Sequence, residues 1–129
     1  MARILIIEDQ TALCRLYKTV LERRGHDVTL AESGEAGIEA ARRTTPDLVI
    51  LDLILPVMSG VQVARHLRED GFLDKARLIV TTGMGEEDTR TIAESLGASA
   101  VLSKPFDIGS MLDVVQSTLE FPAQTPSSA

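Results

Sequence analysis

The feature that most limits the fold of this chain is a regular alternation of short apolar runs with longer amphipathic stretches. Each of five β-branched or aliphatic runs precedes a stretch whose apolar residues recur at helical spacing. The expected strands are Arg3–Ile7, Asp27–Ala31, Leu48–Leu51, Leu78–Thr81 and Ala100–Leu102. Such alternation is typical of a parallel sheet whose right-handed crossover helices cover both faces. The sequence therefore predicts a doubly wound α/β fold of five βα units.

Local capping signals place a helix after each expected strand. Ser33 and Ser59 are suited to cap helices, and Gln62 would complete a capping box with Ser59. Gly25 and Gly97 are suited to the residue that follows a helix. The expected helices run from Thr11 to Arg24, from Ser33 to about Arg43, from Ser59, from Glu86 to Leu96, and from near Asp107.

The apolar spacing also predicts which side of the first and last helices faces the core. The predicted core positions are Leu13, Leu16, Val20 and Leu21 on the first helix, and Ile108, Leu112, Val115 and Leu119 on the last. The chain of 129 residues suits a single domain, expected over residues 1–120. The ending FPAQTPSSA, residues 121–129, is rich in Pro and Ser, and we expect a disordered tail or the start of a linker.

Charge and cysteine content exclude several classes of function. The net charge of −6 leaves no basic footprint for nucleic acid or for an anionic membrane surface. No apolar run approaches the roughly 20 residues of a membrane span. The single Cys14 excludes an internal disulfide and fits a reducing compartment, so the expected location is the cytoplasm. The two histidines, His26 and His66, are expected on the surface.

A carboxylate, Asp52, interrupts the most apolar stretch of the chain, LVILDLILP. An ionised Asp is costly to bury unless it is paired, hydrogen-bonded or bound to a metal. In parallel folds, however, sites form outside the carboxyl ends of the strands, and Asp52 follows the expected third strand. Polar residues follow other strands too, at Glu8-Asp9, Thr81-Thr82-Gly83 and Ser103-Lys104. Asp52 is therefore expected at a functional edge of the sheet.

The residues gathered at this edge are suited to phosphoryl chemistry. Three carboxylates repel one another at neutral pH and need more positive charge than Lys104 supplies, which favours Mg²⁺. Thr82 can donate a hydrogen bond to phosphate, and the amide of Gly83 can approach it closely because no side chain blocks it. Asp52 is then the best candidate nucleophile, forming an acyl phosphate.

At these residues the chain resembles the receiver domain of two-component response regulators. The resemblance spans residues 3 to about 120 and rests on ILIIED, VILDLILP, Gly60, TTG and SKPF. The spacings agree as well, with 30 residues from Asp52 to Thr82 and 22 from Thr82 to Lys104. Each motif alone is weakly specific, but all five in this order are highly specific.

The resemblance implies a flavodoxin-like sheet of strand order 2-1-3-4-5 and a set of residue roles. It implies that Mg²⁺ is held by Glu8, Asp9, Asp52 and the backbone carbonyl of Ile54. It implies that Asp52 accepts the phosphoryl group, that Thr82 and Lys104 contact its oxygens, and that the Lys104–Pro105 peptide is cis. The implied function is that of a signalling phosphoacceptor rather than an enzyme acting on a separate substrate.

The implied partners are a sensor histidine kinase or a histidine phosphotransfer protein, together with an output partner that the sequence does not identify. Output would pass through the fourth helix, fifth strand and fifth helix. The chain departs from the family at Val101, because an aromatic residue usually stands three positions before the lysine. The usual aromatic switch therefore cannot operate here.

Other functions remain open on the residues alone. A phosphohydrolase of the haloacid-dehalogenase class also uses a strand-end Asp, but its second Asp, the general acid, is replaced here by Ile54. A degenerate receiver that only binds partners has usually lost an acid or the lysine, and this chain keeps them. A flavodoxin-like FMN carrier would commonly need aromatic residues that the chain lacks. Mg²⁺-dependent labelling by acetyl phosphate discriminates the first two from a phosphoacceptor.

Overall fold

The computed structural model describes residues 2–83 and 85–120, and it has the architecture that the alternation predicts. Five parallel strands form one sheet in the order β2-β1-β3-β4-β5, as the resemblance implied. The strands are β1 (Arg3–Ile7), β2 (Asp27–Ala31), β3 (Leu48–Asp52), β4 (Arg77–Thr82) and β5 (Ala100–Ser103). The helices are α1 (Thr11–Arg23), α2 (Gly34–Thr44), α3 (Gly60–Glu69), α4 (Glu86–Leu96) and α5 (Ile108–Glu120). A short 3₁₀ turn, η1 (Phe72–Asp74), precedes β4 and was not expected from the sequence.

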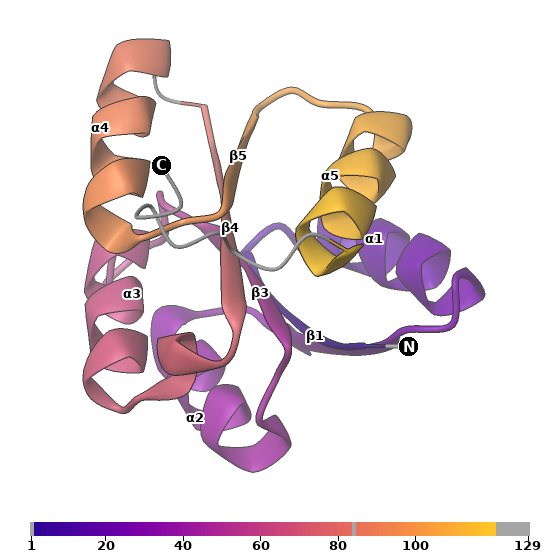
Figure 1. Cartoon of the computed structure of the whole chain (residues 1–129), viewed down its shortest axis with the longest axis horizontal. Coiled ribbons are helices and arrows are strands. Elements are labelled where there is room, and N and C mark those ends of the chain that lie inside the picture. Colours follow the sequence, from indigo (N-terminus) through magenta and orange to yellow (C-terminus); the bar gives the residue numbers. More distant parts are fainter. Residues whose placement is uncertain (1, 84, 121–129) are drawn as a thin grey trace.

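The helices cover both faces of the sheet, with α2, α3 and α4 on one side and α1 and α5 on the other (Figure 1). Strand residues alternate between the two resulting cores, so that Leu5 and Ile7 pack on one face while Ile4 and Ile6 pack on the other. All five residues of the central strand β3 are buried. A strand that is buried on both faces needs apolar residues at successive positions, which explains the continuous apolar run that begins at Leu48.

The predicted helix caps are confirmed. The Ser59 hydroxyl accepts a hydrogen bond from the Gln62 N–H at 3.2 Å, and the Gln62 side chain accepts one from the Ser59 N–H at 3.0 Å. Ser33 caps α2 by accepting from the Ala36 N–H at 3.1 Å. Gly25 follows α1 with a φ of +92°, a backbone conformation that glycine adopts without steric cost.

The predicted core face of α1 was wrong in part. Leu16 is 46% exposed, and the buried residues of α1 are Cys14, Tyr17 and Leu21. The ring of Tyr17 stacks on Phe106, which follows β5, with ring centroids 5.7 Å apart. This contact turns the face with Tyr17 inward and leaves Leu16 in solvent. A stripe of aliphatic residues on the sequence cannot reveal such a partner, because the partner lies 89 positions away.

The predicted core face of α5 was confirmed in part. Val115 is buried, and Ile108, Leu112 and Leu119 are half-buried and pack against the same core. Met111 and Thr118, which were not predicted, are buried as well. His26 is also half-buried rather than a free surface residue, and its Nδ1 accepts a hydrogen bond from the Ala2 N–H at 3.2 Å. His66 is exposed, as expected.

Two further expectations concern membranes and the end of the chain. Within the part that the structure describes, no helix has the length and apolar character to cross a bilayer. The predicted tail or linker, residues 121–129, lies outside the described residues.

Candidate functional site

The sheet brings the ends of four strands to one crevice. Strand register sets Ile7 beside Leu51, Asp52 beside Thr81, and Thr82 beside Ser103. Because paired strands end side by side, the residues just after the end of one strand lie close to the residues just after the end of the next. The crevice accordingly collects the predicted groups from the carboxyl ends of β1, β3, β4 and β5, which are Glu8, Asp9, Asp52, Thr82 and Lys104.

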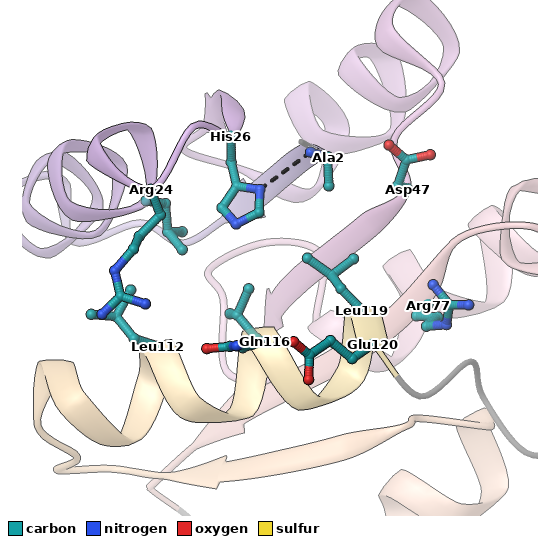
Figure 2. Close-up of a pocket in the computed structure, with 11 residues that line it drawn as sticks. Ala2, Arg24, His26, Asp47, Arg77, Leu112, Gln116, Leu119 and Glu120 are labelled. Atoms are coloured by element: carbon teal, nitrogen blue, oxygen red, sulfur yellow. Dashed lines mark hydrogen bonds between the residues drawn. The ribbon is translucent and has the colours of Figure 1, made fainter.

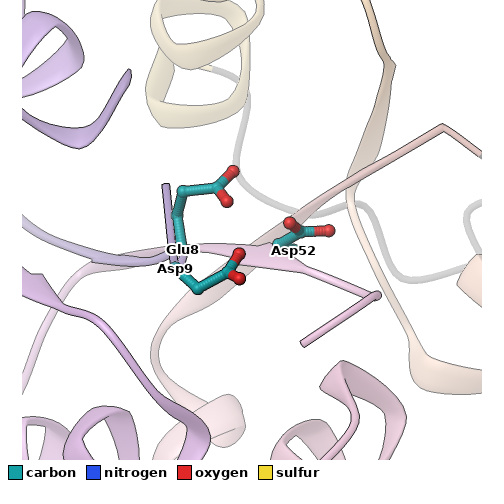
Figure 3. Close-up of side chains that lie close together, drawn as sticks. All are labelled: Glu8, Asp9 and Asp52. Carbon is teal, nitrogen blue, oxygen red and sulfur yellow. The ribbon is translucent and has the colours of Figure 1, made fainter. Parts of the chain in front are cut away.

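Three carboxylates form the centre of this crevice. Glu8, Asp9 and Asp52 each offer an oxygen, and these oxygens all lie within 4.8 Å of one another (Figure 3). Glu8 and Asp52 are only 3% and 4% exposed, whereas Asp9 faces solvent. Burying two neighbouring carboxylates is unfavourable without a counter-charge, so the cluster requires cations.

Lys104 supplies one cation. Its Nζ donates to Glu8 Oε1 at 2.8 Å and to Asp52 Oδ2 at 3.0 Å, bridging the two buried acids. Burial by itself lowers the pKa of Lys104, but its bonds to Glu8 and Asp52 outweigh burial and raise the pKa overall. Burial raises the pKa of Glu8 more than the bond from Lys104 lowers it, and the charge of Asp52 adds to the rise. The Lys104–Pro105 peptide is cis, as the resemblance implied.

The remaining carboxylate oxygens have different partners. Asp52 Oδ1 accepts from the Ile54 N–H at 3.0 Å, and Glu8 Oε2 accepts from the Gln10 N–H at 3.2 Å. Glu8 and Asp52 therefore each have both oxygens hydrogen-bonded within the chain, whereas Asp9 presents an exposed carboxylate. Three carboxylates and one ammonium leave a net charge of −2, which an oxygen-binding divalent ion would neutralise. The donor set thus fits Mg²⁺, with Asp9 as the most accessible ligand.

The phosphate-binding candidates lie beside this cluster on β4. Thr82 ends the strand and is fully buried, and Thr81 holds the neighbouring loop, its carbonyl accepting from the Leu53 N–H at 3.0 Å. Gly83 is exposed, and a Cβ built on it would meet no atom within 4 Å. The fold itself therefore does not require glycine at position 83, and the space beside its backbone is open.

The segment from the end of β3 to the first residue of α3 contains two features that sequence reasoning did not explain. A Cβ on Gly60 would lie 2.3 Å from the carbonyl oxygen of Asp52 and 2.5 Å from Leu53 Cα, so only glycine fits there. The Gly60 N–H also donates to the Leu53 carbonyl at 3.0 Å. Val57 has a φ of +69° and is fully exposed, a strained conformation for a β-branched residue. The spacing of Gly60 from Asp52 was noticed in the sequence, but its steric reason required the folded loop.

A family model described as the response regulator receiver domain matches residues 4–116. The chain belongs to the response regulator receiver domain family. Protein PilH of Pseudomonas aeruginosa is 33% identical over 119 residues, covering 92% of this chain and 98% of PilH. The transcriptional regulator KdpE of Escherichia coli is 39% identical over 111 residues, covering 86% of this chain and 48% of KdpE.

Solved receiver structures are similar in sequence and in three dimensions. A CheY-like response regulator receiver protein from Methanospirillum hungatei superposes with a TM-score of 0.83 at 25% identity, covering 93% of this chain and 94% of that protein. A LuxR-family two-component response regulator from Aurantimonas superposes with a TM-score of 0.84 at 28% identity, covering 98% and 91%. This receiver thus spans nearly all of PilH but about half of KdpE.

Proposed function

We propose that this receiver domain is a phosphoacceptor in two-component signalling and that Asp52 is the residue phosphorylated. The observation that carries the proposal is the bridge of Lys104 between Glu8 and Asp52 at the carboxyl edge of the sheet. The bridge orients the Asp52 carboxylate, and the space beside the backbone of Gly83 is open. A positioned carboxylate is what attack on a phosphoryl group requires.

In the proposed reaction, an Asp52 oxygen attacks the phosphorus of a phosphorylated histidine on the donor protein. The O–P bond forms as the N–P bond breaks, and the histidine nitrogen leaves with the electron pair. Lys104 would pair with a phosphoryl oxygen, and the Thr82 hydroxyl and Gly83 amide would donate to the others. The Ile54 N–H keeps Asp52 in place through its 3.0 Å bond to Oδ1.

We propose that Mg²⁺ is the resident cofactor, held by Asp9 and Asp52, with Glu8 and the backbone carbonyl of Ile54 completing the site. The ion would neutralise charge on the acidic cluster and on the incoming phosphoryl oxygens. Glu8 and Asp52 are both buried, with each of their oxygens hydrogen-bonded within the chain, so the exposed Asp9 offers the most accessible carboxylate for the ion.

The proposed donor is a sensor histidine kinase or a histidine phosphotransfer protein, and the proposed location is the cytoplasm. KdpE, similar over most of this chain, is named as a transcriptional regulatory protein, and this receiver spans less than half of it. We propose that output passes through the surface formed by α4, β5 and α5. Val101 lies on this surface and is half-buried, so the response there would not depend on burying a ring.

Labelling with acetyl phosphate tests the proposal. Wild type should gain one phosphoryl group in Mg²⁺, seen by intact mass, and Asp52→Asn should gain none. Thr81→Ser serves as a matched control because Thr81 is buried beside the site but contacts the loop through its backbone. Labelling that persists in Asp52→Asn would remove Asp52 as the acceptor. Sustained turnover of phosphate esters by wild type would instead favour the phosphohydrolase.

A further inference from the structure

A cavity of about 590 Å³ lies at the opposite edge of the sheet from the acidic cluster. It is an open cavity lined by the end of α1, by one side of α5 and by residues at the starts of β1, β3 and β4 (Figure 2). Its volume is within the 300–1,000 Å³ that is usual for small-molecule sites. Nothing in the proposed phosphoryl chemistry uses this space.

Hydrogen-bond donors without partners line the cavity. The Nε of Arg77 is buried, and among the described residues it has no hydrogen-bond partner. Because Nε itself has almost no accessible surface while Arg77 as a whole is half-buried, a ligand in the cavity would accept from the terminal nitrogens of this guanidinium. The guanidinium of Arg24 lies at the other end of the cavity, near Leu112 (Figure 2).

His26 adds a third donor. Its Nδ1 accepts from the Ala2 N–H at 3.2 Å, so the neutral ring carries its proton on Nε2. Figure 2 shows this second nitrogen pointing into the cavity, between Arg24 and Leu119. Burial lowers the pKa of His26, and nearby positive charge lowers it further, which favours this neutral form.

The two carboxylates that line the cavity already have partners. Asp47 Oδ2 accepts from the Arg3 N–H at 2.8 Å, and Glu120 Oε2 accepts from the Gln116 side chain at 2.9 Å. One oxygen of each carboxylate is therefore occupied within the chain, whereas His26 Nε2 and the guanidinium of Arg24 have no hydrogen-bond partner among the described residues. The apolar part of the lining is formed by Leu21 and Val115, which are buried, and by Leu112 and Leu119, which are half-buried.

We propose that this cavity binds a small amphiphilic carboxylate, with its carboxylate on the donors of Arg77, His26 or Arg24 and its hydrocarbon body against α5. A guanidinium presents a planar pair of donors that matches a carboxylate, and the leucine side chains offer the apolar contact. Such a ligand would join α1 to α5. The inference is independent of phosphorylation at Asp52.

Titration with octanoate, monitored by amide chemical shifts of the whole chain, tests the inference. We expect saturable shifts at residues around the cavity and at least tenfold weaker binding of 1-octanol and octylammonium, which share the tail but not the negative charge. Arg77→Met, which keeps an aliphatic chain, should weaken octanoate binding at least tenfold. Arg24→Gln, at an exposed position, gives a second reading that does not depend on the folding of the Arg77 variant.

Arg65→Gln is the matched control, because Arg65 is exposed on α3, across the sheet from the cavity. It should bind octanoate as wild type does. Equal binding of the three probes, shifts centred on exposed Ile54 and Val57, or an unchanged affinity in both cavity variants would overturn the inference. So would the absence of saturable shifts.

Discussion

The two edges of the sheet use charged residues in opposite ways. At the carboxyl edge, Glu8, Asp52 and Lys104 are bonded mainly to one another, in a buried cluster whose charge the chain does not balance. At the amino edge, Asp47 accepts from the Arg3 backbone at 2.8 Å, and its carbonyl accepts from the Arg77 N–H at 3.0 Å. The carboxyl edge thus holds a net negative charge, whereas at the amino edge a carboxylate hydrogen-bonds neighbouring strands together.

This difference shows how a stable fold can carry an electrostatically unfavourable site. Strands β1, β3 and β4 are hydrogen-bonded to one another at their amino ends and are largely buried. These interactions do not involve the acidic cluster, so the sheet can remain folded despite the unfavourable electrostatic energy of that cluster. The net charge left at the carboxyl edge then remains available for binding a cation and a phosphoryl group.

The largest expected effect is that of Lys104→Met. Removing the ammonium leaves Glu8 and Asp52 buried as like charges, which should lower the free energy of unfolding at pH 7 by about 3 kcal/mol. Urea unfolding without Mg²⁺ measures this. Lys75→Met, at an exposed position, is the control and should change stability by less than about 0.5 kcal/mol. Equal effects of the two substitutions would contradict the contrast between the edges.

The pH dependence of the same pair sharpens this prediction. The folded-state pKa of Lys104 is raised above 10.5, so its contribution is fully present below pH 10.5 and is lost as pH rises through the higher folded value. Lys104→Met should abolish this alkaline loss. The pKa of Glu8 is raised too, so acidification from pH 7 favours the folded state at this group and should recover part of the variant's lost stability. Failure of either trend would contradict the proposed coupling.

Gly60→Ala should have the next largest effect. The added Cβ would meet the Asp52 carbonyl oxygen at 2.3 Å, so the loop must shift, at a cost of about 2 kcal/mol. Labelling of Asp52 by acetyl phosphate should slow as well, because its backbone is displaced. Gly83→Ala is the matched control for stability, since its Cβ would meet nothing within 4 Å. Equal stability of the two alanine variants would show that the loop relaxes freely.

The smallest effects concern one strained residue near each edge. Val57 and Thr45 have positive φ values of +69° and +44°. Val57→Asn should raise the free energy of unfolding by about 1 kcal/mol, because Asn tolerates this conformation better. Thr45→Asn should gain less, since the Thr45 hydroxyl accepts from the Arg3 side chain at 3.1 Å and donates to the Thr44 carbonyl at 2.7 Å. A larger gain at Thr45, measured by urea unfolding, would reverse the comparison.

By itself the sequence determined the fold class, all five strands, the five helices and the capping box at Ser59. These follow from local spacing and from apolar runs, which are properties of neighbouring residues. The sequence also predicted that Glu8, Asp9, Asp52 and Lys104 lie close together, because parallel strands bring their carboxyl ends to one edge of the sheet. The chemical roles of these residues remain proposals.

Only the tertiary structure decided which helix faces are buried and how the site is held. The stacking of Tyr17 on Phe106 turned Leu16 to solvent, and the contact of Gly60 with the Asp52 backbone explained a glycine whose spacing alone had been recognised. The cavity near His26 likewise arises from segments distant in the chain. Such features depend on close packing between residues far apart in sequence, and local patterns carry no information about those distances.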